Sequence, residues 1–278
     1  MKMGESDENT RLARSHTDPI WLQDHFLKSG HDQNTRNGTA TFVAFRKRQF
    51  AATCSHVMTA ASNPDMVPGA PHPTLALHVG KAVLNFSFFT QAGLRSALSA
   101  PGSQYGAQEV DIAIAELTGP HWHLLASSKG KTAIDLDNWR EPNWPTVRLC
   151  YAAGYADEHK EVAAIEGDRM VSTPMLSVVA EPAGPIARDQ RVITLSSRLD
   201  KPHGYYFSGM SGGALYTVEK DVLVPAGIVF EGYPSTEDEG PGRAESPAFL
   251  DQNDIFIRAL TLTPDIFLQW LCGAKLAS

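Results

Sequence analysis

Residues 208–215 read Ser-Gly-Met-Ser-Gly-Gly-Ala-Leu, and the interpretation of the whole chain starts there. A serine between glycines suits a nucleophile, because the backbone must turn tightly and approach the substrate closely. Such a turn also aims the backbone amides of Gly209 and Ser211 at one point, as an oxyanion hole requires. The same residues fit an ordinary glycine-rich turn between two strands, so Ser211 needs support from the rest of the chain.

A nucleophilic serine requires a base and a group that orients the base. Of the ten histidines, only His56 ends a well-patterned strand pair, in Ala-Ala-Thr-Cys-Ser-His-Val over residues 51–57. Asp111 opens the apolar run Asp-Ile-Ala-Ile-Ala-Glu-Leu, where a buried carboxylate needs a partner. Each residue alone has a simpler interpretation, namely a half-buried histidine and a strand-start aspartate that faces solvent.

Chain order separates two serine hydrolase arrangements. Residues 209–213 also match the G-x-S-x-G turn of α/β-hydrolases, in which the catalytic histidine follows the serine. The last histidine of this chain is His203, which excludes that arrangement. The order His56, Asp111, Ser211 remains, and it is the order of the chymotrypsin fold.

Together these segments resemble the trypsin/chymotrypsin family of serine proteases, in the style of its compact bacterial members. Residues 53–57 resemble the family's histidine motif, residues 111–114 its aspartate motif and residues 209–213 its serine motif. Residues 150–155 and 226–232 resemble the strand that opens the second barrel and the strand that pairs with substrate. The resemblance covers residues 37–278.

The resemblance implies an all-β fold of two six-stranded antiparallel β-barrels with a C-terminal α-helix. Short strand candidates separated by many glycines and prolines favour the same class over alternating βαβ units. We expect residues 37–140 to form the first barrel and residues 141–278 the second, with a helix over residues 263–278. Residues 1–36 are expected to be an arm, with a short helix within residues 19–30.

The resemblance also assigns roles. Ser211 attacks the scissile carbonyl, His56 transfers the proton and Asp111 orients His56, while the amides of Gly209 and Ser211 hold the oxyanion. Thr53 matches a family residue that hydrogen-bonds the aspartate. The residues expected to contact substrate are Tyr205, Phe230, Glu231 and Gly232.

The sequence departs from the family pattern at Met210, Tyr205 and Phe230, the last of which replaces a serine that usually adds a hydrogen bond to the catalytic aspartate. Met210 stands where zymogen-type members carry an aspartate, so that activation switch cannot operate in its usual form. Tyr205 stands at the base of the primary specificity pocket, which favours a small or apolar residue before the cut rather than Arg or Lys. We therefore expect a serine endopeptidase restricted to a dedicated target or by a regulatory partner. A catalytically inactive protease-like domain that binds peptides and a hydrolase of small esters are the alternatives.

Composition narrows the function further. The chain has 24 basic and 31 acidic residues, a net charge of −7, which argues against a nucleic-acid binder with a broad basic surface. Its three cysteines imply no disulfide framework, and no run approaches the ~20 apolar residues of a membrane helix. The polar first 19 residues show no signal peptide, so we expect a cytoplasmic protein.

We expect neither a cofactor nor a metal ion. His121 and His123 would share one face of a strand, but no third ligand stands at a recognisable spacing. Cys54, two residues before His56, is interpreted as a small packed residue.

Overall fold

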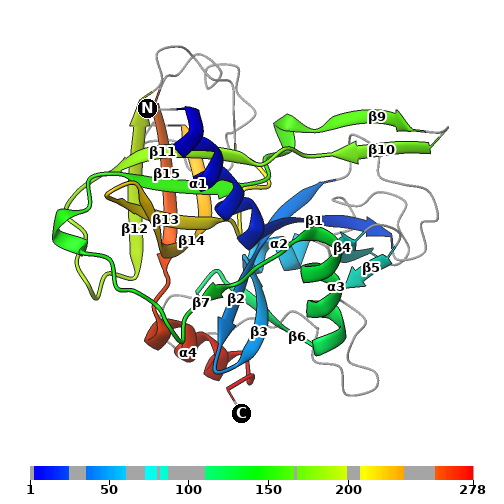
Figure 1. Ribbon diagram of the computed structural model, residues 1–278, viewed down its shortest axis with the longest axis horizontal. Helices are drawn as coiled ribbons and strands as arrows, with labels where there is room; N and C mark the ends of the chain where they lie inside the picture. The colour runs from blue at the N-terminus through cyan, green and yellow to red at the C-terminus, as the bar shows by residue number, and fades with distance from the viewer. Residues whose placement is uncertain are drawn as a thin grey trace.

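Two β-sheets make up most of the molecule, one on each side of a connection between residues 135 and 150 (Figure 1). The computed structural model describes residues 3–24, 36–60, 73–79, 82–86, 110–165, 168–198, 207–234 and 254–277. The protein is mostly β with a C-terminal helix, which confirms the expected fold class. No helix in these ranges is long and apolar enough to cross a membrane.

The second sheet is a closed barrel in which every neighbouring pair is antiparallel, in the order β11-β12-β15-β14-β13-β8. Its strands are β8 (Cys150–Gly154), β11 (Leu176–Pro182), β12 (Val192–Arg198), β13 (Ala214–Glu219), β14 (Val222–Pro234) and β15 (Asp254–Thr261). Side chains alternate between core and solvent, as a barrel requires: in β11, Val178 and Ala180 are buried while Val179 is exposed.

The first sheet is a curled path of six strands, β5-β4-β1-β2-β3-β6, and β7 pairs in parallel with β2. Its strands are β1 (Thr17–Asp24), β2 (Asn37–Phe45), β3 (Arg48–Thr53), β4 (Pro73–Val79), β5 (Ala82–Asn85), β6 (Ala113–Leu117) and β7 (Ile134–Asp135). Within the described ranges its end strands β5 and β6 do not pair with each other, so the strand pairing closes a barrel only in the second sheet.

The N-terminal segment is ordered structure rather than the expected arm. It forms helix α1 (Met3–His16) and strand β1, which pairs with β2 and β4. The short helix predicted within residues 19–30 is therefore wrong up to residue 24, and residues 25–30 lie outside the described ranges. Ile20, Trp21 and Leu22 are all buried, which is typical of a strand covered on both faces. The first sheet thus begins at Thr17 rather than near residue 37.

The remaining elements are helices and a ribbon. Strands β9 (Glu161–Ile165) and β10 (Asp168–Ser172) pair as a ribbon that extends away from the body (Figure 1). The helices are α2 (Ser55–Ala60), α3 (Gly119–Lys129), α4 (Pro264–Gly273) and the 3₁₀ turns η2 (Trp144–Thr146) and η3 (Asp157–His159). His121 and His123 lie on α3, so the strand expected there is wrong. Residues two apart on a helix do not face each other, which removes the geometric basis for a metal pair.

Helix α4 confirms the predicted C-terminal helix and packs against the first sheet. The Thr263 hydroxyl accepts a hydrogen bond from the Ile266 amide at 3.1 Å, so the threonine caps the helix as its sequence indicates. The ring of Phe267 meets Phe45 and Phe50 edge-on, at centroid distances of 5.8 and 5.4 Å. These side chains belong to a core cluster that also contains Tyr216 and Leu260 of the barrel. One continuous core therefore holds the two sheets together.

Candidate active site

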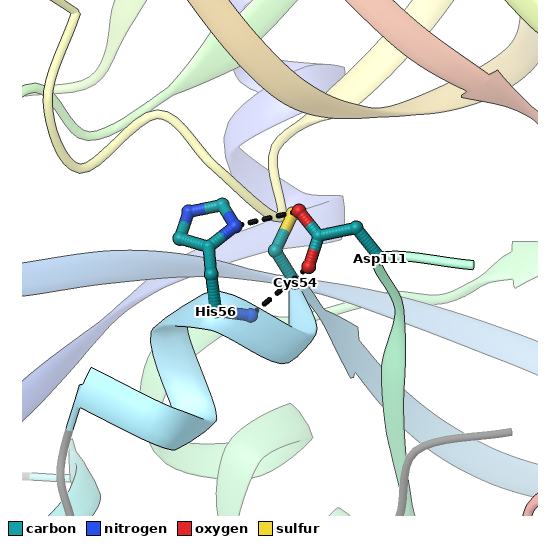
Figure 2. A group of neighbouring side chains, drawn as sticks. All are labelled: Cys54, His56 and Asp111. Carbon is teal, nitrogen blue, oxygen red and sulfur yellow. Dashed lines mark hydrogen bonds and ion pairs between the residues drawn. The ribbon is translucent and has the colours of Figure 1, made fainter. Parts of the chain in front are cut away.

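His56 and Asp111 form a hydrogen-bonded pair at one end of the first sheet. His56 lies in the first turn of α2, directly after β3, and Asp111 lies just before β6. Because Thr53 of β3 pairs with Ala113 of β6, the residues beyond these two strand ends meet. Nδ1 of His56 lies 2.6 Å from Oδ2 of Asp111, and the His56 backbone amide donates to Oδ1 at 2.9 Å (Figure 2).

This geometry fixes the state of both groups. Burial alone would raise the pKa of Asp111, but hydrogen bonds and charge interactions with His56 outweigh it, so the pKa lies below its usual value. An ionised carboxylate only accepts hydrogen bonds, so the ring proton of His56 resides on Nδ1. Nε2 is then the atom able to accept a proton.

Ser211 lies in a tight double turn between Phe207 and Gly213. The Met210 amide donates to the Phe207 carbonyl at 3.1 Å, and the Gly213 amide to the Met210 carbonyl at 2.8 Å. Gly209 and Gly212 occupy the third position of these two turns with φ of +89° and +92°. A positive φ at that position alone is the signature of a type II turn and favours glycine. We call residues 207–213 the serine turn.

The serine turn is packed so closely that its glycines have no room for side chains. A Cβ on Gly212 would lie 1.9 Å from the Thr39 carbonyl oxygen and 2.5 Å from the Thr53 hydroxyl. A Cβ on Gly213 would lie 2.2 Å from the Ala153 carbonyl oxygen. The serine turn therefore lies directly against Thr53, the last residue of β3, and Thr53 stands three residues before His56 in the chain.

Two backbone amides of the serine turn lack acceptors. Within the described ranges, neither the Gly209 amide nor the Ser211 amide donates a hydrogen bond, whereas the amides of Met210, Gly212 and Gly213 all do. These two are the amides that the sequence analysis assigns to an oxyanion hole. The Ser211 hydroxyl donates to the Phe230 carbonyl at 3.2 Å. Among the residues that the structure describes, no hydrogen bond joins this hydroxyl to His56.

Strand β2 holds the serine turn, a role that the sequence analysis missed. The Thr39 hydroxyl donates to the Gly209 carbonyl and the Thr41 hydroxyl to the Gly212 carbonyl, both at 2.7 Å, and the Thr39 amide donates to the Ser211 carbonyl at 2.9 Å. The available signal was a polar residue at every second position, Asn37-x-Thr39-x-Thr41, in an otherwise apolar strand. Thr53, expected to hydrogen-bond the aspartate, instead donates to the Thr39 carbonyl at 2.7 Å.

The predicted substrate-binding residues Phe230, Glu231 and Gly232 lie on β14 beyond the part that pairs with β13. Within the described ranges their only strand partner is β15, so the other edge is unpaired beside the serine turn. Glu231 forms an ion pair of 2.8 Å with Arg258. Tyr205 lies outside the described residues, so the predicted preference for small or apolar side chains stays a prediction.

Cys54 completes a group of three ligand-type side chains with His56 and Asp111, whose donor atoms lie within 4.8 Å of one another (Figure 2). The thiol is fully buried and donates to the Val229 carbonyl at 3.3 Å. Burial raises the pKa of Cys54 well above its usual value, whereas metals bind the thiolate. Nδ1 of His56 is also committed to Asp111. The chemistry of this group thus favours a proton-transfer pair over a metal site.

Three solved structures are similar to this chain at low sequence identity. A thermostable serine protease, AL20, from an extremophilic microorganism has 13% identity and a TM-score of 0.48, covering 94% of this chain and 98% of its own. A structure from a study of the coupled folding and binding of the Sesbania mosaic virus VPg protein has 15% identity and a TM-score of 0.39, covering 92% and 94%. The NSP4 proteinase of equine arteritis virus has 16% identity and a TM-score of 0.33, covering 81% and 69%.

No protein-family model and no curated protein matches the chain. The three structural similarities are too low to assign a family or an activity. What identifies the architecture is the strand pairing itself: a closed six-stranded antiparallel barrel, a curled six-stranded path and a C-terminal helix, with His56, Asp111 and the serine turn gathered where the two sheets meet.

Proposed function

We propose that this protein is a serine endopeptidase whose triad is His56, Asp111 and Ser211. The observation that carries the proposal is the hydrogen-bonded pair of His56 and Asp111 beside a serine turn, two of whose amides donate no hydrogen bond to any described residue. An imidazole with Nδ1 fixed by a carboxylate is the base that a serine nucleophile needs.

The proposed reaction follows from this arrangement. The Ser211 hydroxyl turns from the Phe230 carbonyl toward Nε2 of His56 and attacks the scissile carbonyl carbon, while its proton passes to His56. The amides of Gly209 and Ser211 donate to the oxyanion that forms. The C–N bond then breaks as His56 returns the proton to the leaving amine, which leaves an ester on Ser211. A water molecule deprotonated by His56 hydrolyses this ester and restores the enzyme.

The unpaired edge of β14 supports a peptide as the substrate. Glu231 and Gly232 pair with β15 on one side, Phe230 forms a bulge before them, and within the described ranges no strand occupies the other side. An extended peptide would add to this edge as a further strand, with its scissile carbonyl carried toward the serine turn. Small esters have no backbone to pair in this way, so this edge favours peptide substrates.

Covalent labelling with a fluorophosphonate tests the proposal, because the activated serine replaces fluoride at phosphorus. We expect the wild type to be labelled, Ser211→Ala to be unlabelled and His56→Ala to react at least ~1,000-fold more slowly. Ser177→Ala is the matched control, since Ser177 is an exposed serine on β11 outside the serine turn. Its labelling should equal that of the wild type.

The second candidate function is a catalytically inactive domain that binds peptides. The hydrogen bond from the Ser211 hydroxyl to the Phe230 carbonyl favours it, because within the described ranges no hydrogen bond joins that hydroxyl to His56. A folded wild type that fails to react with the fluorophosphonate would contradict the endopeptidase and support this candidate. The expected cytoplasmic location, the dedicated target and the regulatory partner stay predictions.

A further inference from the structure

The peptide bond between Ser208 and Gly209 is the critical part of the proposed oxyanion hole. It is the central peptide of the first type II turn, and its N–H is the acceptor-free amide of Gly209. Rotating such a peptide by about 180° converts a type II turn into a type I turn and points the N–H the opposite way. Something must therefore hold this peptide in one orientation.

The carbonyl of the same peptide is held by Asp157. The Asp157 amide donates to the Ser208 carbonyl at 2.7 Å. In a trans peptide the C=O and the following N–H point in opposite directions, and the described chain contains no cis peptide. Directing the Ser208 carbonyl at Asp157 therefore directs the Gly209 N–H away from Asp157.

The side chain of Asp157 adds further contacts to the same turn and to the first sheet. Its carboxylate accepts from the Ser208 hydroxyl and from the Asn37 amide, each at 3.3 Å. Nζ of Lys160 lies 2.7 Å from this carboxylate, and the Lys160 side chain is only 6% exposed. The Lys160 ammonium also lies 5.7 Å from the ring of Trp21 on β1. The carboxylate is thus fixed by a buried cation that is itself held by the first sheet.

We propose that Asp157 is a positioning residue that keeps the Ser208–Gly209 peptide in the orientation needed for the oxyanion hole. Met210, where a zymogen-type aspartate would stand, is buried in the barrel core, and its uncharged thioether cannot form an ion pair. The turn is instead held from outside, by Asp157 after β8 and by Thr39 on β2. The intact chain then carries a formed oxyanion hole without any cleavage of its N-terminus. This inference rests on the proposed function.

Three substitutions at Asp157 separate its contributions. Asp157→Asn keeps the amide and the side-chain acceptor, Asp157→Ala keeps only the amide, and Asp157→Pro removes both. Proline fits here, because Asp157 is the first residue of a 3₁₀ turn and Ala156 before it has φ −76° and ψ +139°, values that proline requires of its predecessor. Compared with Asp157→Ala, the proline variant therefore lacks one further group, the backbone hydrogen-bond donor, with little change in backbone conformation.

The measurement is the fluorophosphonate labelling rate, recorded together with the fraction of protein finally labelled. We expect Asp157→Asn to react within about twofold of the wild type, Asp157→Ala about 3- to 10-fold more slowly and Asp157→Pro about 100-fold more slowly. A misdirected amide slows the reaction of every molecule, whereas unfolding lowers the final fraction and leaves the rate of the folded molecules unchanged. The matched control is Asp137→Ala, since Asp137 accepts from the amides of Arg46 and Lys47 in a hairpin of the first sheet. It should react at the wild-type rate.

The outcomes distinguish this inference from the proposed function. If the wild type is labelled, and Asp157→Ala and Asp157→Pro are both labelled at the wild-type rate, the positioning role is overturned. The proposal of an endopeptidase then still stands. A folded wild type that does not react overturns both. If the proline variant does not fold, the labelling rates of Asp157→Asn and Asp157→Ala are compared instead. Equal labelling rates in these two variants overturn the inference.

Discussion

Gly212 shows at the scale of one residue why the serine turn tolerates so little change. Its backbone has φ +92°, and its α-carbon lies against the Thr39 carbonyl and the Thr53 hydroxyl. An alanine here would carry both the strain of a positive φ and a collision with backbone atoms. Gly130, which ends α3 with φ +63°, has open space around its α-carbon and carries only the first of these costs.

We predict that Gly212→Ala is destabilised by about 3 kcal/mol or more, because overpacking adds to backbone strain. Gly130→Ala, the matched control, should lose about 1 kcal/mol. Urea unfolding of both variants beside the wild type measures the difference. Equal losses in the two variants would mean that the packing around Gly212 is looser than described.

Strand β2 is the element that couples the two sheets at the site. Its residues at alternate positions, Asn37, Thr39 and Thr41, hydrogen-bond the serine turn and Tyr155, which lies just after β8. The Thr39 hydroxyl serves two partners, because it donates to the Gly209 carbonyl and accepts from the Tyr155 amide at 3.0 Å. Since Thr39 is fully buried, losing this hydroxyl would leave two buried polar groups unpaired.

We predict that Thr39→Val, which preserves shape and removes the hydroxyl, lowers both stability and the fluorophosphonate labelling rate. The expected loss of stability is about 2 kcal/mol or more. Thr74→Val is the control, because the Thr74 hydroxyl is equally buried and donates to Asn85 far from the serine turn.

Both threonine variants should be less stable than the wild type, and only Thr39→Val should label more slowly under conditions where each is fully folded. A normal rate in Thr39→Val would show that β2 supports the fold without ordering the turn.

At the scale of the whole molecule, the N-terminal segment links the two sheets. α1 leads into β1 of the first sheet (Figure 1). Its side chains reach the barrel: Thr10 hydrogen-bonds the Tyr151 hydroxyl at 3.2 Å, and Nδ1 of His16 lies 3.0 Å from the Tyr216 hydroxyl. Tyr155 adds a bond of 3.2 Å to the Thr17 carbonyl. Burial lowers the pKa of His16 to about 4, so the imidazole in this contact is neutral near neutral pH.

This contact makes stability depend on pH. Between the ordinary histidine value of about 6.5 and the native value of about 4, the unfolded chain binds a proton at His16 that the folded chain does not. Stability therefore falls as the pH falls through this window, by about 2–3 kcal/mol from this residue at about pH 4.5 relative to pH 7. Asp111 adds to the loss of stability at pH values below this window, since its pKa lies below its usual value of 3.8.

Urea unfolding of the wild type and of His16→Gln at both pH values measures the effect. Glutamine keeps a hydrogen-bonding group for Tyr216 but does not titrate, so the variant should lose much less stability on acidification. Part of the dependence should remain, because the pKa values of His78 and His121 are also lowered by burial. An identical pH dependence in both proteins would show that His16 is not buried as described.

The sequence by itself determined the features that depend on local pattern and chain order. Short strand candidates separated by glycines and prolines predicted a mostly β fold, a helix was expected over residues 263–278, where α4 forms, and the order His56, Asp111, Ser211 excluded one hydrolase arrangement. The pairing of His56 with Asp111 was also foreseen, because a carboxylate at the start of a buried strand needs a partner.

Only the tertiary structure decided which elements support that pair. The apolar run at residues 20–22 fits a helix as well as a strand, and pairing with β2 and β4 makes it a strand. Asp157 gave no local signal, and the alternating polar residues of β2 did not show which groups Thr39 would contact. The groups that Asp157 and Thr39 contact in the serine turn lie 51 and 170 residues away along the chain. A hydrogen bond across such a separation arises from how two sheets pack, and the local sequence does not show which distant group a polar side chain will meet.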